Sequence, residues 1–376
     1  MATRIHHVRD RSALDRALPT IEACNLLAVD TESNSMHAYQ EQVCYVQLRA
    51  GDDIFLIDTV ALRDLDPLVS IFADPNRVTI LHGADYDVVC MARDFGIRFG
   101  NIFDTMLASQ LLDKPGLGLA ALCFEYFEVE LDKSLTKYNW GQRPLEDKYV
   151  KYLVEDVAYL YEIRDYLVTA VEAADLMEEV EIEFRRTADL QGKVRVVDPE
   201  GYRKIKGARQ LDVGSAGVLK ALYLVRERIA EAENLPPFKV ANSQALLALS
   251  RVKKASASQI AKQRAFRPRI WRTYEEEIVE AVRQGLTGEI KPVAPEKKPR
   301  MPKEIGLCND ELREWRKKPA EEREVPRLVI LPNHAINEIL EHRPKTKEEL
   351  ALLKGLGSKR IQLYGDAILE ITNRLL

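Results

Sequence analysis

Five side chains from three distant stretches of the chain have the types and spacings that metal-assisted hydrolysis needs. Asp30 and Glu32 flank Thr31 directly after residues 26–29, a short apolar run that predicts a buried strand. Alternation along a strand sends Asp30 and Glu32 to the same side, where both can hold one metal ion. Open α/β sheets bind ligands at the carboxyl ends of their strands. The motif therefore suits a metal site, although a solvated strand end would look the same.

A further carboxylate follows the next buried strand, which is predicted over residues 78–81. Asp85 and Asp87 both stand at the start of a helical pattern that Gly96 ends. Spacing alone leaves either aspartate available for the site. An aspartate in a first helical turn also commonly caps the helix.

The third stretch supplies a tyrosine and an aspartate inside a helical pattern. Tyr152 and Asp156 are four residues apart, so they lie on one helix face, one turn apart. Alone, this spacing is also typical of an ordinary helix pair. With the earlier motifs it completes four carboxylates, and phosphodiester hydrolysis uses two divalent cations about 3.5–4 Å apart. The set predicts a site for two Mg²⁺ or Mn²⁺ ions, in which the Tyr152 hydroxyl orients the attacking water.

The elements that position these residues follow from the hydrophobic pattern of residues 1–200. From Thr105 to about Leu190 the apolar spacing is helical. A hairpin followed by strand–helix–strand units implies a mixed sheet covered by helices. Short runs of β-forming residues predict strands at residues 26–29, 42–48, 53–57, 78–81 and 102–104.

The C-terminal half is helical in pattern and repeats itself at an offset of 90 residues, so that Leu222–Arg226 corresponds to Leu312–Arg316. A repeat of this length predicts two copies of one small helical domain. We call residues 208–288 the first repeat and residues 306–376 the second repeat. Residues 289–305 between them are rich in proline and basic residues, which is typical of a linker.

Charge is divided unevenly along the chain. Residues 1–200 carry 20 Lys+Arg against 36 Asp+Glu, whereas residues 201–300 carry 21 against 10. An acidic body joined to a basic segment suits an enzyme that holds cations in one part and a polyanion in another. Two independently solvated surfaces would give the same pattern.

Several classes of protein are not expected. The sequence has no apolar run long enough to span a membrane and no signal-peptide pattern at its start. The five cysteines are scattered and odd in number, as in a cytoplasmic protein with reduced thiols. No P-loop pattern is present, so we expect no ATP hydrolysis. The histidines lack metal-ligand spacing, and His82 is expected to make a structural hydrogen bond.

The order of the motifs resembles the DEDD exonuclease superfamily. Its tyrosine branch carries D-x-E, a later lone aspartate and Y-x-x-x-D, whereas its histidine branch would need a histidine where Lys151 stands. Within the tyrosine branch the sequence is similar to the ribonuclease D family, and the two repeats resemble HRDC domains. The segments that carry this likeness are Leu131 to Ser134, Trp140, Arg143 to Leu145 and Tyr152 to Leu160. The resemblance spans roughly the whole chain.

The resemblance implies a ribonuclease-H-like α/β exonuclease domain, with a five-stranded mixed sheet and helices on both faces, followed by two small all-α HRDC domains. It implies that Asp30, Glu32 and Asp156 hold the first metal ion. It also favours Asp87 over Asp85, with Asp30 and Asp87 at the second ion and Tyr152 positioning the water. By likeness to proofreading exonucleases, Met36 would wedge against the terminal base, although core packing would explain it equally well.

The basic residues of the first repeat are interpreted as an RNA-contacting cluster whose binding depends steeply on salt. Phe266 and Trp271 lie among them and are predicted to be core residues. In the second repeat, the glycine-containing junction from Lys354 to Arg360 would either expose backbone N–H groups to a phosphate or form a plain tight turn. The cluster comprises Arg251, Lys253, Lys254, Lys262, Arg264, Arg267, Arg269 and Arg272.

The function that the resemblance implies is 3′→5′ hydrolysis of single-stranded RNA ends, with release of nucleoside 5′-monophosphates. Precursors of transfer RNA would be the substrates, and the enzyme would be a cytoplasmic monomer. The alternatives are a DNA 3′→5′ exonuclease in repair and, last, a non-catalytic adaptor. The adaptor would need a degraded metal site, and no catalytic position is missing here.

Overall fold

The structure, a computed structural model, describes residues 3–132, 135, 137–292 and 302–376. It divides into two compact units. Unit 1 comprises Met1–Glu32, Val43–Lys193 and Pro299–Leu376, and unit 2 comprises Ser33–Gln42 and Val194–Lys298. Unit 1 therefore holds the sheet and the second repeat, while unit 2 holds the first repeat. Of the linker predicted over residues 289–305, residues 293–301 lie outside the described residues.

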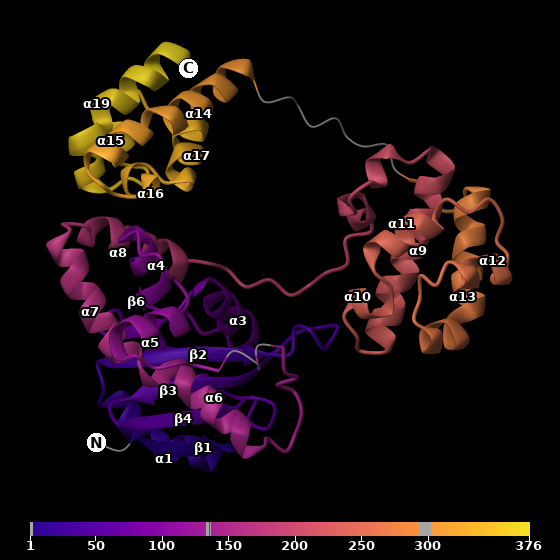
Figure 1. The fold of residues 1–376 in the computed structure, drawn as a ribbon, viewed down its shortest axis with the longest axis horizontal. Coiled ribbons are helices and arrows are strands. Elements are labelled where there is room, and N and C mark those ends of the chain that lie inside the picture. Colours follow the sequence, from indigo (N-terminus) through magenta and orange to yellow (C-terminus); the bar gives the residue numbers. More distant parts are fainter. Residues whose placement is uncertain (1–2, 133–134, 136, 293–301) are drawn as a thin grey trace. The chain divides into compact units, whose positions relative to one another are not determined.

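Unit 1 is built on a mixed sheet whose strand order is β1-β4-β3-β2-β5-β6 (Figure 1). β3 and β4 form an antiparallel hairpin, and β1 pairs with β4 in parallel. β5 runs parallel to both β2 and β6. The strands are β1 (Arg4–Val8), β2 (Leu26–Ser33), β3 (Val43–Ala50), β4 (Asp53–Asp58), β5 (Val78–Leu81) and β6 (Ile102–Asp104).

The sheet has six strands within the described residues, so the prediction of five was wrong in number. The missed strand is β1, an edge strand whose first four residues are exposed. Its sequence has neither an apolar run nor a clear alternation, because only Val8 faces the core. Arg4 and His6 instead bind Asp53 of the neighbouring strand, each at 2.6 Å.

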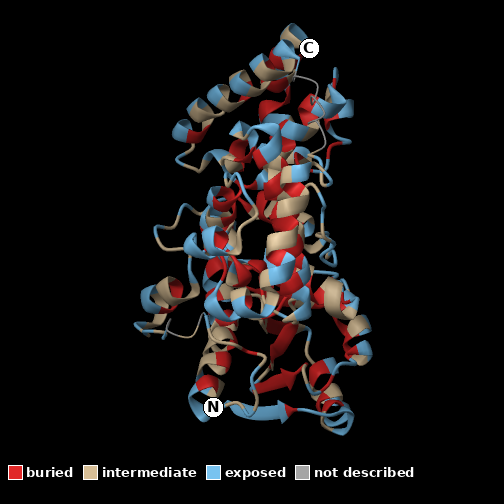
Figure 2. Cartoon of the chain, turned by 90° about the vertical axis from the view of Figure 1, so that its right-hand side faces the viewer, coloured by how far each residue is buried: buried red, intermediate tan, exposed pale blue. Residues whose placement is uncertain are grey.

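Helices pack on the sheet, as predicted for an α/β domain. α6 contacts β3 and β4, α7 contacts β5, and α8 contacts β6. Buried residues, red in Figure 2, fill much of the sheet, and β4 is buried along its whole length. The helices of this domain are α1 (Arg11–Glu22), α2 (Asp66–Ala73), α3 (Asp85–Phe95), α4 (Thr105–Leu111), α5 (Leu119–Phe127), α6 (Asp147–Ala158), α7 (Leu160–Ala173) and α8 (Met177–Ala188).

The helices of the two repeats correspond in order, with α14 and α15 together matching α9, which confirms the internal repeat. α10 and α16 begin 90 residues apart, as do α11 and α17, and α12 and α18. A short 3-10 turn, Gly201–Lys204, precedes the first repeat, which begins with a second such turn, Ala208–Gln210, and continues with α9 (Val213–Ala232), α10 (Pro237–Val240), α11 (Ser243–Leu249), α12 (Ala257–Lys262) and α13 (Pro268–Thr287). The second repeat begins inside α14 (Lys303–Trp315) and continues with α15 (Lys317–Glu322), α16 (Arg327–Ile330), α17 (Asn333–His342), α18 (Lys347–Leu350) and α19 (Gly357–Leu375).

Within unit 1, the second repeat is attached to α8 through its glycine-containing junction. The Glu178 carboxylate accepts hydrogen bonds from the backbone N–H groups of Ser358 and Lys359, at 2.7 and 2.8 Å. Gly357 has φ of +74°, and a Cβ there would lie 2.4 Å from Ile182 Cδ1. The N–H groups that the sequence offered to a phosphate thus bind a protein carboxylate.

No helix of the described residues is both long enough and apolar enough to cross a membrane. All five cysteines are free, and only Cys24 is not fully buried, which agrees with the prediction of reduced core thiols.

Candidate metal centre

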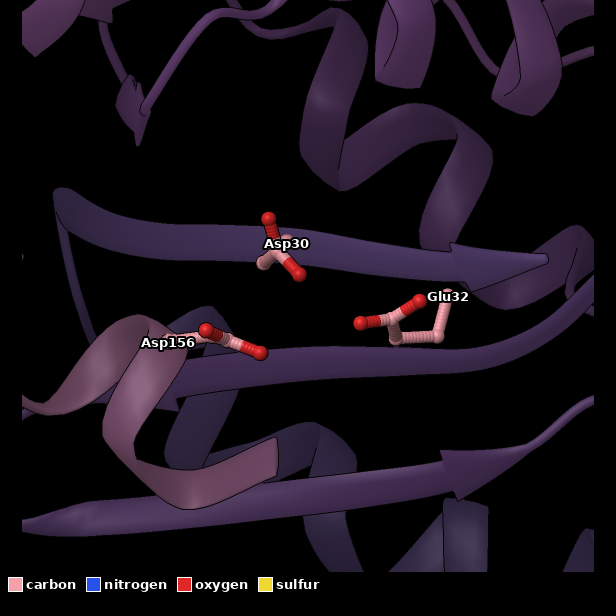
Figure 3. A group of neighbouring side chains, drawn as sticks. All are labelled: Asp30, Glu32 and Asp156. Atoms are coloured by element: carbon pink, nitrogen blue, oxygen red, sulfur yellow. The ribbon is translucent and has the colours of Figure 1, made fainter. Parts of the chain in front are cut away.

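The candidate site lies where β2 passes α6. Asp30 and Glu32 are two residues apart on β2, and Asp156 is in the last turn of α6. One carboxylate oxygen from each of the three lies within 4.8 Å of the others. Figure 3 shows the three side chains converging from the strand and the helix. The i,i+2 alternation of a strand and one helix face therefore suffice to build a cluster of three carboxylates.

The crowding of these carboxylates changes their acidity. Burial, followed by the charges of Asp156 and Asp87, holds the pKa of Asp30 well above its ordinary value. Burial, with the same two charges, raises the pKa of Glu32 to about 9. Burial is also the main cause that raises the pKa of Asp156 to about 7. Without a cation, the protein therefore resists ionisation of the whole cluster.

Asp87 lies beside this cluster and is nearly fully buried at 6% exposure. Its carboxylate accepts a hydrogen bond of 2.5 Å from the Thr31 hydroxyl, the residue between the two β2 carboxylates. Burial raises the pKa of Asp87 to about 7, and its charge raises the pKa of Asp30 and of Asp156. Asp87 is thus near the cluster, although it is outside the group of three whose oxygens can share one ion.

Asp85, the rival to Asp87, is exposed and accepts a hydrogen bond from Thr187. The difference follows from the first turn of α3, which points one aspartate outward and the other toward β2. His82 makes the structural hydrogen bond predicted for it, at 2.9 Å to Thr105, and burial lowers its pKa to about 4. Asp104 is buried and accepts from the N–H groups of Gly83 and Ala84, so it fixes the turn that precedes α3.

Tyr152 lies one turn before Asp156 on α6 and is half-buried. Its hydroxyl lies close enough to the Glu32 carboxylate to oppose the rise in the pKa of Glu32. Burial and then the charge of Asp156 raise the pKa of Tyr152, so the phenol stays protonated at neutral pH. The ring packs against Trp140, with centroids 5.5 Å apart. A neutral hydroxyl fixed next to the carboxylates can donate or accept a hydrogen bond there.

In the sequence, Arg143 stands out only as part of the resemblance to ribonuclease D, whereas in the structure it holds a loop in place. Its guanidinium binds both oxygens of the buried Asp58, at 2.7 and 2.5 Å, and lies 4.3 Å from the centre of the Tyr45 ring. It also donates to the Trp140 carbonyl at 2.7 Å. Arg143 thereby fixes the loop that carries Trp140, the residue on which Tyr152 packs. No local pattern predicts a contact between residues 85 positions apart in sequence.

The donor set fits divalent cations. Asp156 Oδ2 is buried without a hydrogen-bond partner in the described residues. Burial is the main cause of the raised pKa in all four carboxyls, and no basic side chain is among the groups that shift them. A hard cation with oxygen ligands would satisfy the free oxygen and compensate the charge.

The residues predicted to contact RNA belong to unit 2. Met36 is 44% exposed, which is inconsistent with the alternative that it is a core residue. All eight residues of the basic cluster are exposed, but Arg269 binds Glu233, and Lys253 lies 4.0 Å from Asp212. Phe266 is buried in the core of the first repeat, as predicted.

Comparisons with known proteins show that this site lies in a 3′-5′ exonuclease domain. Residues 5–172 match the 3′-5′ exonuclease family, and residues 215–282 and 308–372 match the HRDC domain. Ribonuclease D of Desulfotalea psychrophila is 31% identical over 237 residues, 62% of this chain and 63% of that protein. The exosome complex component 10 homolog of Caenorhabditis elegans is 30% identical over 253 residues, 66% of this chain and 29% of that protein. The chain therefore spans less than two thirds of either relative.

The fold is shared with a solved structure over the whole chain. The crystal structure of Escherichia coli RNase D, described as an exoribonuclease involved in structured RNA processing, has a TM-score of 0.71 at 23% identity. The match covers 100% of this chain and 99% of that one. These findings confirm the resemblance to ribonuclease D and the fold that it implied.

Proposed function

We propose that this chain, in which a member of the 3′-5′ exonuclease family precedes two HRDC domains, hydrolyses single-stranded RNA from its 3′ end and releases nucleoside 5′-monophosphates. The observation that carries the proposal is the convergence of Asp30, Glu32 and Asp156 within 4.8 Å, beside the buried Asp87. The relatives named ribonuclease D support RNA as the substrate.

We assign the metal ligands as the family resemblance implies. Asp30, Glu32 and Asp156 would hold one divalent ion, and Asp30 and Asp87 would hold a second, as Mg²⁺ or Mn²⁺. Bound there, such ions activate water and stabilise the leaving oxygen of a phosphodiester. The buried carboxylates contribute by holding their negative charges close together.

Tyr152 would position the attacking water. Its hydroxyl is near enough to Glu32 to lower the pKa of that carboxyl, and the Trp140 ring packs against the Tyr152 ring. A raised pKa keeps its proton in place, so it would act by orienting the water through hydrogen bonds and not as the base.

The test uses the full chain and a single-stranded RNA oligomer labelled at its 5′ end. With Mg²⁺ the label should appear in a ladder of products shortened by single nucleotides, and chelation should stop the reaction. Asp30→Asn and Asp87→Asn should remove activity, while Asp85→Asn, in the same helical turn, should keep it. Loss of activity in Asp85→Asn with retention in Asp87→Asn would reverse the assignment.

A DNA oligomer of the same sequence distinguishes the sugar. We expect faster hydrolysis of RNA, because the curated relatives that match are named for RNA enzymes. A clear preference for DNA would replace the proposal with a DNA exonuclease. As the finer setting we propose transfer-RNA precursors as substrates and a monomer in the cytoplasm, where free cysteines remain reduced.

A further inference from the structure

The segment that joins β2 to β3 is anchored in the core of the first repeat. This segment, Ser33–Gln42, belongs to unit 2, whereas the strand residues on either side of it belong to unit 1. We call it the β2–β3 loop. Of its residues, all of which the structure describes, only Ala38 and Tyr39 are buried. Tyr39 is 5% exposed and is part of the hydrophobic core of the first repeat. The loop that begins directly after Glu32 therefore adds an aromatic side chain to a helical core.

Polar contacts also hold the chain around Tyr39 on the first repeat. The backbone N–H of Tyr39 donates to Asn234 Oδ1 at 3.1 Å. The side-chain amide of Gln40 donates to the Arg195 carbonyl at 3.3 Å. The Arg195 guanidinium lies 4.9 Å from the centre of the Tyr39 ring and binds the buried Glu227 of α9 at 2.5 Å. Tyr39 is thus fixed both through its ring and through its backbone.

Hydrogen bonds inside the β2–β3 loop connect this anchored part to an exposed turn. The Asn34 carbonyl accepts from the His37 N–H at 2.7 Å, and Met36 in this turn is 44% exposed. Asn34 also closes the loop, because its Oδ1 accepts from the Gln42 N–H at 2.9 Å. The loop is therefore compact with joined ends, and fixing one part of it restricts the rest.

The asparagine that binds the loop occupies a left-handed backbone position. Asn234 follows the end of α9 and has φ of +47°, a conformation in which glycine and asparagine are favoured. At the offset of 90 residues, the second repeat has Glu324 in the same conformation, with φ of +53°. The fold of the repeat thus does not require an amide side chain at this point. What distinguishes Asn234 is the oxygen that it offers to the Tyr39 N–H.

We infer that the first repeat positions the β2–β3 loop for substrate binding, with Tyr39 as the positioning residue. The inference rests on the proposed function. Because the loop begins directly after the proposed metal ligand Glu32, its order limits where the terminal nucleotide can lie. Fixing a free loop costs conformational entropy for every residue, and the contacts at Tyr39 offset that cost before RNA arrives. Without these contacts, RNA would have to order the loop on binding, and its apparent affinity would fall.

The first test removes one anchoring hydrogen bond without disturbing the helix end. Asn234→Gly deletes the acceptor, and glycine is the residue best suited to the left-handed position. For hydrolysis of labelled RNA by the full chain with Mg²⁺, we expect KM to rise about 2- to 10-fold, the range for one lost hydrogen bond, and kcat to stay within about twofold. Asn234→Asp keeps an acceptor oxygen and should keep the KM of the wild type. An unchanged KM in Asn234→Gly would overturn the inference.

The second test removes the anchor itself. Tyr39→Ala should raise KM about 10- to 100-fold, because the ordered loop becomes a minor population. Tyr39→Phe keeps the ring and should restore the KM of the wild type. Val282→Ala is the control, because it removes a fully buried side chain of α13 from the core of the same repeat. A rise in KM in Val282→Ala equal to that in Tyr39→Ala would overturn the inference, since any loss of packing in the repeat would then suffice.

Hydrogen exchange in EDTA separates the positioning of the loop from the proposed function. The amides of His37 and Gln42 should exchange roughly 10-fold faster in Tyr39→Ala than in the wild type, whereas the amides of β4 should be unaffected. Hydrolysis of RNA by the wild type, with unchanged KM and unchanged loop exchange in Tyr39→Ala, would remove the positioning role and leave the exonuclease. Faster loop exchange with weaker RNA binding in EDTA, in a protein that hydrolyses no RNA with Mg²⁺, would keep the positioning role and remove the proposed function.

Discussion

Replacing Asp156 by asparagine should stabilise the metal-free protein while it abolishes turnover. Asp156 is one of three carboxylates within 4.8 Å, and its Oδ2 is buried without a partner in the described residues. The asparagine side chain would keep the shape and remove one negative charge from the cluster. Metal ligands that crowd together without their metal are a common source of stored instability in enzymes.

The size of the effect follows from the pKa of Asp156, which is raised from 3.8 to about 7. A rise of this size corresponds to roughly 4 kcal/mol against the ionised form once the pH exceeds both values. Because four carboxylates share the penalty, neutralising one should recover about 1–3 kcal/mol, or roughly 2–12 °C in Tm. Loss of a metal ligand should reduce kcat by about 10³-fold or more.

The assay is thermal unfolding in EDTA at about pH 8, repeated with excess Mg²⁺ and combined with single-nucleotide release from RNA. We expect Asp156→Asn to have a higher Tm than the wild type in EDTA and little further rise with Mg²⁺. Asp165→Asn, an exposed change on α7, is the control and should behave like the wild type. A variant less stable than the wild type in EDTA, or one still stabilised fully by Mg²⁺, would show that the Asp156 charge does not destabilise the metal-free protein.

Three further predictions follow from the same geometry. Tyr152→Phe should lower kcat about 10²- to 10³-fold, because the variant can no longer orient the attacking water through a hydroxyl. The Mg²⁺-induced rise in Tm should remain unchanged. Loss of that rise would instead show that the hydroxyl takes part in metal binding. The folded protein holds carboxyl protons that the unfolded chain has lost, with the pKa of Glu32 at about 9 and of Asp87 at about 7, so metal-free stability should fall as the pH rises from about 5 to 8. A flat or rising Tm in EDTA over that range would contradict the charge cluster. Glu178→Ala should speed hydrogen exchange at the amides of Ser358 and Lys359 roughly 10-fold, while unchanged protection would show that the second repeat is held without that carboxylate.

Most of the fold was predictable because its signals are local. Buried strands such as β4 appear as continuous apolar runs, and the 90-residue offset predicted that both repeats share one order of helices. β1 was not predictable, since an exposed edge strand with two histidines lacks both an apolar run and alternation. The placement of the second repeat with the exonuclease domain also lay beyond the sequence. It depends on hydrogen bonds between the Glu178 carboxylate and backbone N–H groups 180 residues away. Every residue except proline has a backbone N–H, so the residue types do not indicate which N–H groups will bind this carboxylate.

In the candidate site, too, the local features were predictable and the long-range contacts were not. The grouping of Asp30 with Glu32, and the turn between Tyr152 and Asp156, follow from the periods of strand and helix. Choosing Asp87 over Asp85 needed a resemblance, because only the three-dimensional turn decides which aspartate is buried. The packing of Trp140 behind Tyr152, held by Arg143, is a long-range contact that no spacing rule encodes. Of the eight basic residues, the sequence could not tell which are paired with acids.

Binding of divalent cations by the β2 and α6 carboxylates can be seen by anomalous scattering from crystals grown with Mn²⁺. We expect an anomalous peak between Asp30, Glu32 and Asp156, and its loss in Asp156→Asn. Absence of any peak at these carboxylates under saturating Mn²⁺, or ions bound only elsewhere, would contradict it.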